Sequence, residues 1–491
     1  MDSGQADSLA PSIVHRPPSI GPLVVYQIYP RSFQDSDGDG LGDLRGIESR
    51  LDHLSELGVD ALWLSPFYPS PQADMGYDVS DYEDVDPAFG SLEDFDRLLA
   101  AAHERGIKVL LDFVPSHTSI DHPWFREHPD WYIWSDRDGP QNNWIASFGG
   151  PAWSPDPYGR GWYLHSFYPE QPDLDWRNPE VAEAMQEAVG FWVDRGVDGF
   201  RLDALQHLLK HPAYPDNPPA SEPYPLPLPE EYARLSPVYS INQPGVGEPL
   251  AALREAAGGT YLVGEVYLPS DQHAPYLEHL DQTFGFELFH SPWDAESLSA
   301  AIGDALPTTA WVLSNHDFPR LATRIGEENL RAAALLLLTL PGSAFIYQGD
   351  EIGLVDGPGA DPPFDRAGRD GARHPMQWDA TRTGGFSDGE PWLPAVDPAA
   401  RNVADQRDDP ASLLTLYREL IALRGRLGDE FELLESEPGV LAYRRGHHLV
   451  AINTTGDERA APPHGDPVLV TAPLTEAGRL PPRSGVVAHR A

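Results

Sequence analysis

The sequence predicts an α/β protein, a (β/α)8 TIM barrel with a loop-rich domain inserted after the third strand and a small C-terminal β-domain. Three observations favour this fold. Seven short apolar runs alternate with amphipathic helical patterns between residues 24 and about 355, and a weaker run at 284–290 makes eight. Eight strand–helix units form a closed parallel barrel, which needs about 250 residues before insertions. Reactive side chains follow the strands at their carboxyl ends, where such barrels hold their sites.

The eight predicted strands are apolar runs that end at turn or polar residues. They cover residues 24–30, 59–66, 108–115, 198–205, 261–267, 284–290, 310–317 and 343–353. Helical patterns lie between them at 91–106, 179–196 and 328–340, and a last amphipathic helix is expected at 410–427. Trp63, Trp192 and Trp311 fall within these patterns, so we expect them in the core.

Two long insertions interrupt the barrel pattern. Residues 116–175 are loop-like and rich in Trp, Tyr, Pro and Gly, and we expect them to form an inserted domain, domain B. Residues 211–247 contain eight prolines between Pro212 and Pro229, a density that favours a stiff lid or rim. Apolar runs separated by Gly and Pro turns predict the C-terminal β-domain at 429–491. The catalytic barrel is then expected from residues 1–115 and 176–428.

The composition argues against several classes of function. The 491 residues include 76 acids against 34 Lys and Arg, a net charge of -42, whereas nucleic acid and anionic membranes require a basic surface. Because there is no cysteine, disulfides and cysteine nucleophiles are excluded. The N-terminus lacks a basic start followed by an apolar run, and no segment approaches membrane-spanning length. We expect a soluble cytoplasmic protein, whose oligomeric state the sequence does not predict.

Polar side chains enter the predicted strands at their carboxyl ends, which all meet at one mouth of a barrel. These residues are Asp112, His117, Arg201, Asp203, Glu265, His316 and Asp317. Several acids accompanied by arginine and histidine, without a thiol, indicate cleavage of a glycosidic bond. That reaction needs one ionised and one protonated carboxyl group. A metal-dependent hydrolase is less well supported, because the histidines lack the spacing of metal ligands.

Two of these acids have different predicted surroundings. Asp203 is two residues from Arg201, so both side chains face the same side of the strand and the guanidinium favours an ionised carboxylate. Glu265 is flanked by apolar residues in LVGEVY, a setting that raises a carboxyl pKa and suits a general acid. Adjacent barrel strands can hold two carboxyl groups roughly 5 Å apart, as cleavage with retention of configuration requires.

The motifs DFVPSH, QPDLDW, GFRLDA, GEVY and SNHD identify a family resemblance. From Val24 to the C-terminal β-domain, the chain resembles the α-amylase superfamily (glycoside hydrolase family 13), in its α-glucosidase and oligo-1,6-glucosidase branch. The resemblance implies that Asp203 is the nucleophile, Glu265 the acid/base and Asp317 the transition-state stabiliser.

The same resemblance implies a set of sugar-binding residues. It assigns Asp74, Tyr77, His117, Arg201 and His316 to a glucose pocket, Phe148, Phe167 and Gln171 to its walls, and Arg373 to its closure. Three positions depart from the family pattern: Ser116 and Asp175 replace asparagines, and Ala204 stands where α-1,6-acting relatives carry valine. A small residue after the nucleophile leaves room on the acceptor side and resembles α-1,4-acting members.

By resemblance, the expected function is that of a retaining, exo-acting α-glucosidase that releases glucose from maltose-like substrates. Transglucosylation to a sugar or another hydroxyl acceptor is an alternative. Sucrose isomerisation and trehalose synthesis are rarer chemistries of similar scaffolds. A catalytically dead, amylase-like subunit is disfavoured, because such relatives lose catalytic acids and carry a membrane segment. Small-molecule α-glucosides are the expected partners, and no organic cofactor is expected.

The stretch FQDSDGDGLGDLRGI resembles the first nine positions of a calcium loop, with ligands at Asp35, Asp37, Asp39, the Leu41 carbonyl and Asp43. Position 12 is Gly46, where an EF-hand needs a bidentate glutamate. The residues alone leave a metal site and an acidic surface loop equally open. The family resemblance favours a structural Ca²⁺ or Mg²⁺ site in this first barrel loop.

Overall fold

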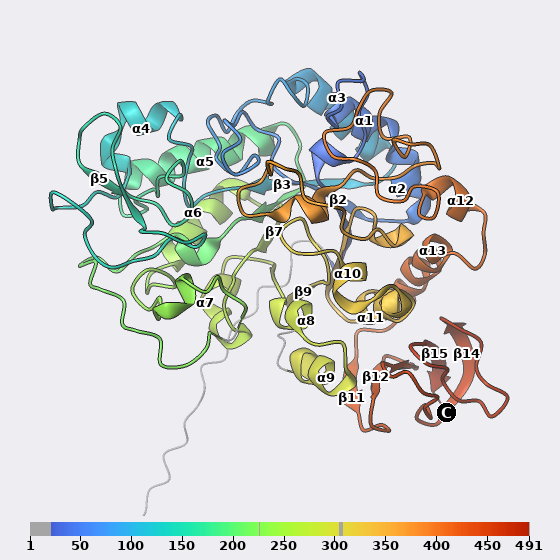
Figure 1. The fold of residues 1–491 in the computed structure, drawn as a ribbon. Helices are drawn as coiled ribbons and strands as arrows, with labels where there is room; N and C mark the ends of the chain where they lie inside the picture. The colour runs from blue at the N-terminus through green and yellow to red at the C-terminus, as the bar shows by residue number, and fades with distance from the viewer. Residues whose placement is uncertain (1–20, 225, 304–307, 491) are drawn as a thin grey trace, which may run out of the picture.

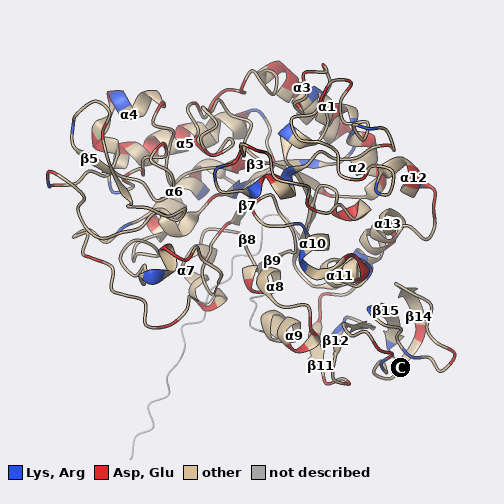
Figure 2. Ribbon diagram, viewed as in Figure 1, with Lys and Arg blue, Asp and Glu red and all other residues tan. Residues whose placement is uncertain are grey.

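The computed structural model describes residues 21–224, 226–303 and 308–490. The absence of a signal sequence was read from the first twenty residues, which lie outside the described part of the chain. Among the described residues, no helix is both long enough and apolar enough to cross a membrane. Acidic residues are spread over the barrel, the inserted segment and the C-terminal sheet, as Figure 2 shows.

A closed barrel of eight parallel strands forms the centre of the molecule, as predicted (Figure 1). The strands are β1 (Val24–Ile28), β2 (Ala61–Leu64), β3 (Lys108–Phe113), β6 (Gly199–Leu202), β7 (Tyr261–Gly264), β8 (Gln282–Phe284), β9 (Thr309–Val312) and β10 (Ser343–Tyr347). Their order around the barrel is β1-β10-β9-β8-β7-β6-β3-β2. Every strand therefore ends at the same mouth.

One predicted strand is wrong. Residues 284–290 were expected to be extended, but β8 ends at Phe284 and Phe286–His290 forms the short helix α8. Phe286, Leu288 and Phe289 are all buried. A short apolar run that is buried on several sides has no clear period, so its pattern cannot separate a strand from a helix.

The helices cover the outside of the barrel. They are α1 (Leu44–Ser49), α2 (Leu51–Leu57), α3 (Leu92–Glu104), α5 (Pro179–Asp194), α6 (Gly247–Ala257), α7 (Ala274–Leu277), α9 (Ala295–Gly303), α10 (Leu321–Ile325), α11 (Leu330–Thr339), α12 (Val403–Arg407) and α13 (Leu413–Arg424). The four predicted helices are confirmed as α3, α5, α11 and α13. Ser91 caps α3 by accepting from the Asp94 N–H, and Asn178 caps α5 in the same way. The three tryptophans expected in the core are buried.

Between β3 and α5 the chain forms helix α4 (Pro123–Glu127) and a hairpin of β4 (Trp153–Pro155) and β5 (Trp162–Leu164). This segment has a small apolar core of its own that includes Trp144 and Trp153. The proline-rich loop 211–247 is attached to it: Trp144 Nε1 donates to the Pro215 carbonyl at 2.8 Å, and Asn143 Nδ2 donates to the Asn217 carbonyl at 2.9 Å.

An antiparallel sheet closes the chain, as predicted. Its strands are β11 (Phe431–Leu434), β12 (Val440–Arg445), β13 (His448–Asn453), β14 (His464–Val470) and β15 (Gly485–Arg490), in the order β11-β12-β13-β15-β14. The sheet lies beside α11 and α9, at the lower right of Figure 1. Helix α11 is buried at every residue except Arg331, and it packs against α13 and against strands β13 and β15 of this sheet.

Candidate active site

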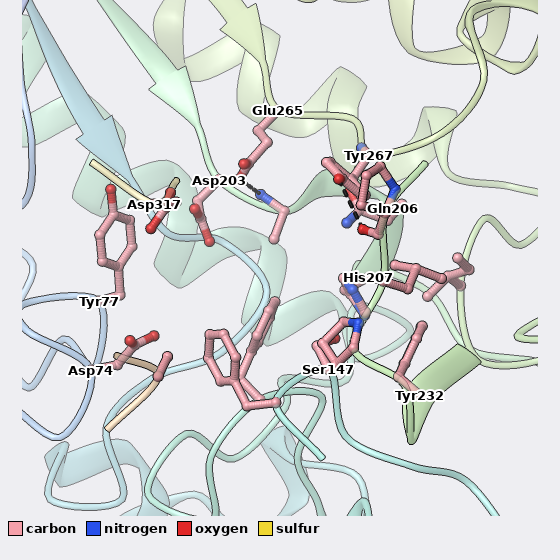
Figure 3. Close-up of a pocket in the computed structure, with 18 of the residues that line it drawn as sticks. Asp74, Tyr77, Ser147, Asp203, Gln206, His207, Tyr232, Glu265, Tyr267 and Asp317 are labelled. Carbon is pink, nitrogen blue, oxygen red and sulfur yellow. Dashed lines mark hydrogen bonds between the residues drawn. The ribbon is translucent and has the colours of Figure 1, made fainter. Parts of the chain in front are cut away.

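A pocket opens at the carboxyl ends of the barrel strands (Figure 3). Its volume is about 430 Å³, within the range of pockets that hold drug-sized ligands. The predicted site residues that line it are Asp74, Tyr77, His117, Phe148, Phe167, Asp203, Glu265 and Asp317. Gln171, Arg201, His316 and Arg373 are buried directly behind this lining and hydrogen-bond to it.

The strand register places Asp203 and Glu265 side by side. Leu202 of β6 pairs with Gly264 of β7, so the next residue of each strand leaves the barrel at the same level. The Glu265 N–H donates to the Leu202 carbonyl at 2.8 Å. Ala204 N then donates to Glu265 Oε2 at 3.2 Å, which orients the glutamate toward the neighbouring aspartate.

Arg201 joins these two carboxyl groups. Its Nη1 is 2.6 Å from Asp203 Oδ1, and its Nη2 is 2.7 Å from Glu265 Oε2. The same Nη1 is 2.7 Å from Asp112 Oδ1, so the guanidinium is buried among three acids. The acid and the nucleophile inferred from the sequence are therefore held side by side by one guanidinium.

Burial raises the pKa of Glu265 further than that of Asp203. It raises the pKa of Glu265 to about 8, an effect that Arg201 opposes and that Asp203 and Asp317 reinforce. Burial also raises the pKa of Asp203, and Arg201 opposes this rise. Glu265 keeps its proton to higher pH than Asp203 does. Near neutral pH the glutamate can donate a proton while the aspartate is ionised.

The neutral side chain of His316 lies behind the pocket lining and is hydrogen-bonded to Tyr77. His316 Nδ1 accepts from Gln27 Nε2 at 2.7 Å, which leaves the ring hydrogen on Nε2, 2.6 Å from the Tyr77 hydroxyl. The rings of Tyr77 and His316 stack with centroids 5.4 Å apart. Burial lowers the pKa of His316 to about 3. Tyr77 in turn donates to Asp112 Oδ2 at 2.9 Å, so its hydroxyl group is held by both His316 and Asp112.

Arg369 bridges the acids at the other end of the pocket. Its Nη2 is 2.5 Å from Asp74 Oδ1, its Nη1 is 2.9 Å from Asp317 Oδ1, and its Nε is 2.7 Å from Asp365 Oδ2. Burial alone would raise the pKa of Asp317, but His316 and Arg369 hold that pKa well below its usual range. Asp317 therefore faces the pocket as a carboxylate.

The family resemblance implied that Arg373 closes the pocket, but Arg373 does not line it. Arg373 is fully buried; its Nε donates to the His316 carbonyl at 2.8 Å, and it supports Asp317 from behind. Arg369, which the sequence analysis did not single out, lines the pocket instead. Both arginines belong to one 3-10 helix, Arg369–Arg373, and only its placement decides which side chain reaches the pocket.

The remaining predicted side chains form the wall beside Asp74. Gln171 Nε2 donates to Asp74 Oδ2 at 3.0 Å and lies 2.9 Å from His117 Nε2. The ring of Phe167 packs against His117 and Phe148, with centroids 5.1 and 5.7 Å apart. Carboxylates, an arginine and aromatic faces thus surround a space suited to a small polyhydroxylated ring.

Comparison with known proteins identifies the family. The family model for the α-amylase catalytic domain matches residues 27–429. The chain belongs to the α-amylase family. It is 39% identical to a probable α-glucosidase of Rhizobium meliloti (strain 1021), over 86% of each chain. It is 37% identical to an oligo-1,6-glucosidase of Parageobacillus thermoglucosidasius, over 89% of this chain and 90% of that one.

A solved structure of this family is also similar along its whole length. The crystal structure of XgtA, an α-glucosyl transfer enzyme, has a TM-score of 0.90 and 37% sequence identity, and covers 97% of this chain and 100% of that chain. The predicted α-glucosidase branch of the α-amylase family is thereby confirmed, and the chain is a glycoside hydrolase.

The three departures from the α-amylase family pattern have local explanations. Ser116 Oγ lies 2.9 Å from His117 Nδ1, so a hydrogen bond to this histidine is kept. Asp175 lies outside the pocket lining and accepts from the Arg177 N–H at 3.1 Å. Ala204 has left-handed backbone angles, φ 45° and ψ 43°, which β-branched residues rarely adopt.

The acidic loop of this α-amylase family member partly fits a cation site. Asp35, Asp37 and Asp39 each offer a carboxylate oxygen, and these oxygens lie within 4.8 Å of one another. Such oxygen donors suit Ca²⁺ or Mg²⁺. Asp43 caps α1 instead: its Oδ1 accepts from the Gly46 N–H at 2.7 Å and its Oδ2 from the Ser36 N–H at 2.8 Å.

Proposed function

We propose that this chain is a retaining, exo-acting α-glucosidase that releases α-glucose from the non-reducing end of short α-glucosides. The observation that carries the proposal is the pair of carboxyl groups at the barrel mouth, because Asp203 and Glu265 both contact the buried Arg201, at 2.6 and 2.7 Å. A protonated acid close to an ionised nucleophile is what a double displacement requires. The proposed reaction uses no organic cofactor.

The reaction proceeds in two steps. Glu265 gives its proton to the glycosidic oxygen while Asp203 attacks C1, so that a β-glucosyl ester forms and the leaving group departs as an alcohol. Glu265, now a carboxylate, takes a proton from water as the water oxygen attacks C1 and the ester bond to Asp203 breaks. Asp317 is fixed as a carboxylate by Arg369 and would grip hydroxyl groups of the distorted sugar ring.

Action at the chain end is supported by the closed glucose side of the pocket. Arg369 spans the gap between Asp74 and Asp317 there. On the same loop, Arg366 pairs with Glu170 of the inserted segment at 2.9 Å. A sugar chain that continued beyond the glucose ring would collide with these side chains, so the ring bound next to Asp203 must be a terminal one.

A preference for α-1,4 linkages is proposed from Ala204, which lines the pocket directly after the nucleophile. Its methyl group leaves room for the second ring of maltose. Initial rates on maltose and isomaltose test this preference. Faster cleavage of isomaltose would contradict it.

We also propose that Asp35, Asp37 and Asp39 hold a structural Ca²⁺ or Mg²⁺, with the Leu41 carbonyl as a further ligand; Asp43, which was predicted as a ligand, supports the loop through its bonds to Gly46 and Ser36. Three converging carboxylates support a cation, because carboxylate oxygens at this spacing are the donors that Ca²⁺ and Mg²⁺ prefer. The ion would stabilise the first barrel loop and would supply no chemistry to bond cleavage.

Azide rescue tests the two catalytic roles. Asp203→Gly should lose turnover of an aryl α-glucoside, and added azide should restore release of the aryl group and yield a β-glucosyl azide. With Glu265→Ala, an activated aryl glucoside should instead give an α-glucosyl azide. Asp52→Ala is a matched control, since its carboxylate is 80% exposed on the outside of the barrel. Near-normal turnover by Asp203→Gly without azide would overturn the nucleophile assignment.

A further inference from the structure

A glutamine side chain is buried inside the barrel next to the site. Gln27 of β1 is 1% exposed, and Val25, on the same face of the strand, belongs to an apolar cluster with neighbouring strands. Gln27 Nε2 is 2.7 Å from His316 Nδ1 and donates to Ser65 Oγ at 3.2 Å. Its Oε1 is buried without a hydrogen-bond partner among the described residues, which is unfavourable. An apolar side chain would avoid this cost, so the N–H groups of Gln27 point to a role of their own.

The neighbouring histidine has a single ring hydrogen. The His316 ring is buried against the rings of Tyr29 and Tyr77, with centroids 5.8 and 5.4 Å away. The charged side chains that act on it are Asp317, Arg201, Arg369 and Arg373. Burial lowers the pKa of His316 to about 3; the aspartate opposes this effect, and the three arginines reinforce it. The ring is therefore neutral, so one of its nitrogens donates and the other accepts.

The direction of the hydrogen bonds follows from Asp112, because a carboxylate can only accept. Arg201 Nη1 donates to Asp112 Oδ1 at 2.7 Å, and the Tyr77 hydroxyl donates to Asp112 Oδ2 at 2.9 Å. Since this hydroxyl has one hydrogen, its oxygen accepts from His316 Nε2 at 2.6 Å. The other ring nitrogen, Nδ1, then has a lone pair that requires a donor, and Gln27 supplies it.

These contacts form one chain of hydrogen bonds from β1 to the nucleophile. It runs through Gln27, His316, Tyr77, Asp112, Arg201 and Asp203. His316 Nε2 also lies 3.4 Å from Asp317 Oδ2, and Figure 3 shows Tyr77 and Asp317 close together at the pocket. A ring hydrogen on Nδ1 instead would turn the Nε2 lone pair toward the Asp317 carboxylate and draw the Tyr77 hydrogen away from Asp112.

We propose that Gln27 is a positioning residue: by donating to Nδ1 it keeps the ring hydrogen of His316 on Nε2, and this sets the direction of every hydrogen bond from the ring to Asp112. The inference rests on the proposed glucosidase function. Gln27 is not part of the pocket lining, so it acts on the reaction only through His316. Asp112 and Asp317 each keep a donor in this arrangement. Loss of one hydrogen bond to a charged group should lower the rate by about tenfold or more.

Gln27→Glu tests the direction of the chain, because a carboxyl group donates to Nδ1 only while it holds a proton. When the carboxyl group and the ring together lose that proton, the carboxylate accepts from Nδ1, so the ring hydrogen moves there and the chain reverses. On an aryl α-glucoside, kcat/KM should be close to wild type at about pH 5 and lower by at least about tenfold at about pH 8. The alkaline limb of the pH profile should therefore shift to lower pH, and an unshifted limb would overturn the inference.

The sign of this shift separates it from the effect of an added charge. A carboxylate that acted only through its charge would raise the pKa of Glu265 and move the alkaline limb to higher pH. Gln348→Glu is the matched control, because Gln348 is buried directly after the neighbouring strand β10 and hydrogen-bonds to main-chain atoms of Tyr29 and Ser32. Its alkaline limb should not move to lower pH. An equal downward shift in both variants would overturn the assignment.

A second variant removes the donor without adding a charge. Gln27→Leu has a side chain of similar size and should lower kcat/KM by about threefold to tenfold at every pH, without moving either limb of the profile. A rate equal to that of the wild type would overturn the inference.

A third measurement needs no variant at position 27. In wild-type enzyme labelled with ¹⁵N-histidine, NMR should show the ring hydrogen of His316 on Nε2 from pH 5 to 8, with the signal assigned by its absence from His316→Gln. A hydrogen on Nδ1 would overturn the inference. If the wild type hydrolysed no α-glucoside, the proposed function itself would fail, whereas the NMR spectrum would still show which nitrogen Gln27 leaves protonated.

Discussion

Removal of the Arg369 side chain is predicted to lower both the stability of the protein and its activity. The side chain is 12% exposed and contacts three carboxylates, those of Asp74, Asp317 and Asp365. Breaking a buried ion pair from one side costs about 3–5 kcal/mol, because the remaining charges stay buried without a partner. Unfolding entropy amounts to roughly 1 kcal/mol per degree for 491 residues. The melting temperature of Arg369→Ala should therefore fall by about 3–5 °C if the chain unfolds cooperatively.

Arg366→Ala is the matched control for this prediction. It removes an arginine from the same loop, but its partner Glu170 and the arginine are 40% and 46% exposed. Such surface pairs contribute about 0–1 kcal/mol, so the melting temperature should change by about 1 °C or less. Arg369→Lys keeps the charge but loses the planar fork that spans Asp74 and Asp317, and it should melt between the alanine variant and wild type.

The pH dependence separates lost charge pairing from lost packing. In the wild type, the pKa of Asp317 is below its unfolded value because His316 and Arg369 outweigh the effect of burial. The stability that ionised Asp317 adds to the folded state is therefore present above about pH 4 and declines as the pH falls further. Without Arg369, protonation of a carboxylate relieves the repulsion between Asp74 and Asp317. The difference in melting temperature between wild type and Arg369→Ala should therefore become smaller as the pH falls.

Differential scanning fluorimetry from pH 4 to 8, with kcat/KM on an aryl α-glucoside at each pH, measures both effects. At neutral pH, kcat/KM should fall by at least about tenfold, since Asp317 loses a charge-assisted hydrogen bond. The reasoning is refuted if Arg369→Ala melts within a degree of Arg366→Ala. A melting gap that stays constant down to pH 4 would refute the electrostatic cause.

Three further outcomes are expected. The pH profile of kcat/KM should be a bell that rises as Asp203 ionises, its pKa raised by burial to about 6, and falls as Glu265 loses its proton, its pKa raised by burial to about 8. An alkaline fall that persists in Glu265→Gln would contradict this assignment. A chelator should remove metal from the wild type and lower its melting temperature. It should have no effect on a variant that combines Asp37→Asn and Asp39→Asn. Unchanged metal content and melting temperature in the wild type would exclude the cation. Ala204→Val should lower the ratio of maltose to isomaltose cleavage by about tenfold, because its methyl groups fill the acceptor side and disfavour the left-handed backbone. Ala204→Gly is the control, and an equal ratio in the valine variant would count against the steric argument.

Most of the candidate active site could be predicted from the sequence because it depends on strand ends. A parallel barrel brings all its carboxyl ends to one mouth, so Asp203, Glu265 and Asp317 had to meet once the eight-unit rhythm was recognised. Residues two apart on one strand face the same side, and this accounts for the contact between Arg201 and Asp203. These relations follow from the repeat of the backbone and need no knowledge of packing.

Other features were decided only by the tertiary structure. Arg369 and Arg373 lie in the same short turn, and the choice between them follows from where that turn packs against Asp74, 295 positions earlier in the chain. The helix at Phe286–His290 replaced a predicted strand because burial on several sides removes the periodic pattern that separates the two.

The amino-acid sequence by itself determined the barrel, the acids at its mouth and the family, since these follow from local periodicity and from short motifs. Only the tertiary structure decided that the hydroxyl groups of Tyr224 and Tyr267, which line the pocket with Glu265, already donate to backbone carbonyls. A tyrosine in a sequence can offer either its ring or its hydroxyl group. Which of the two faces a ligand depends on hydrogen bonds between distant segments, and no local pattern encodes them.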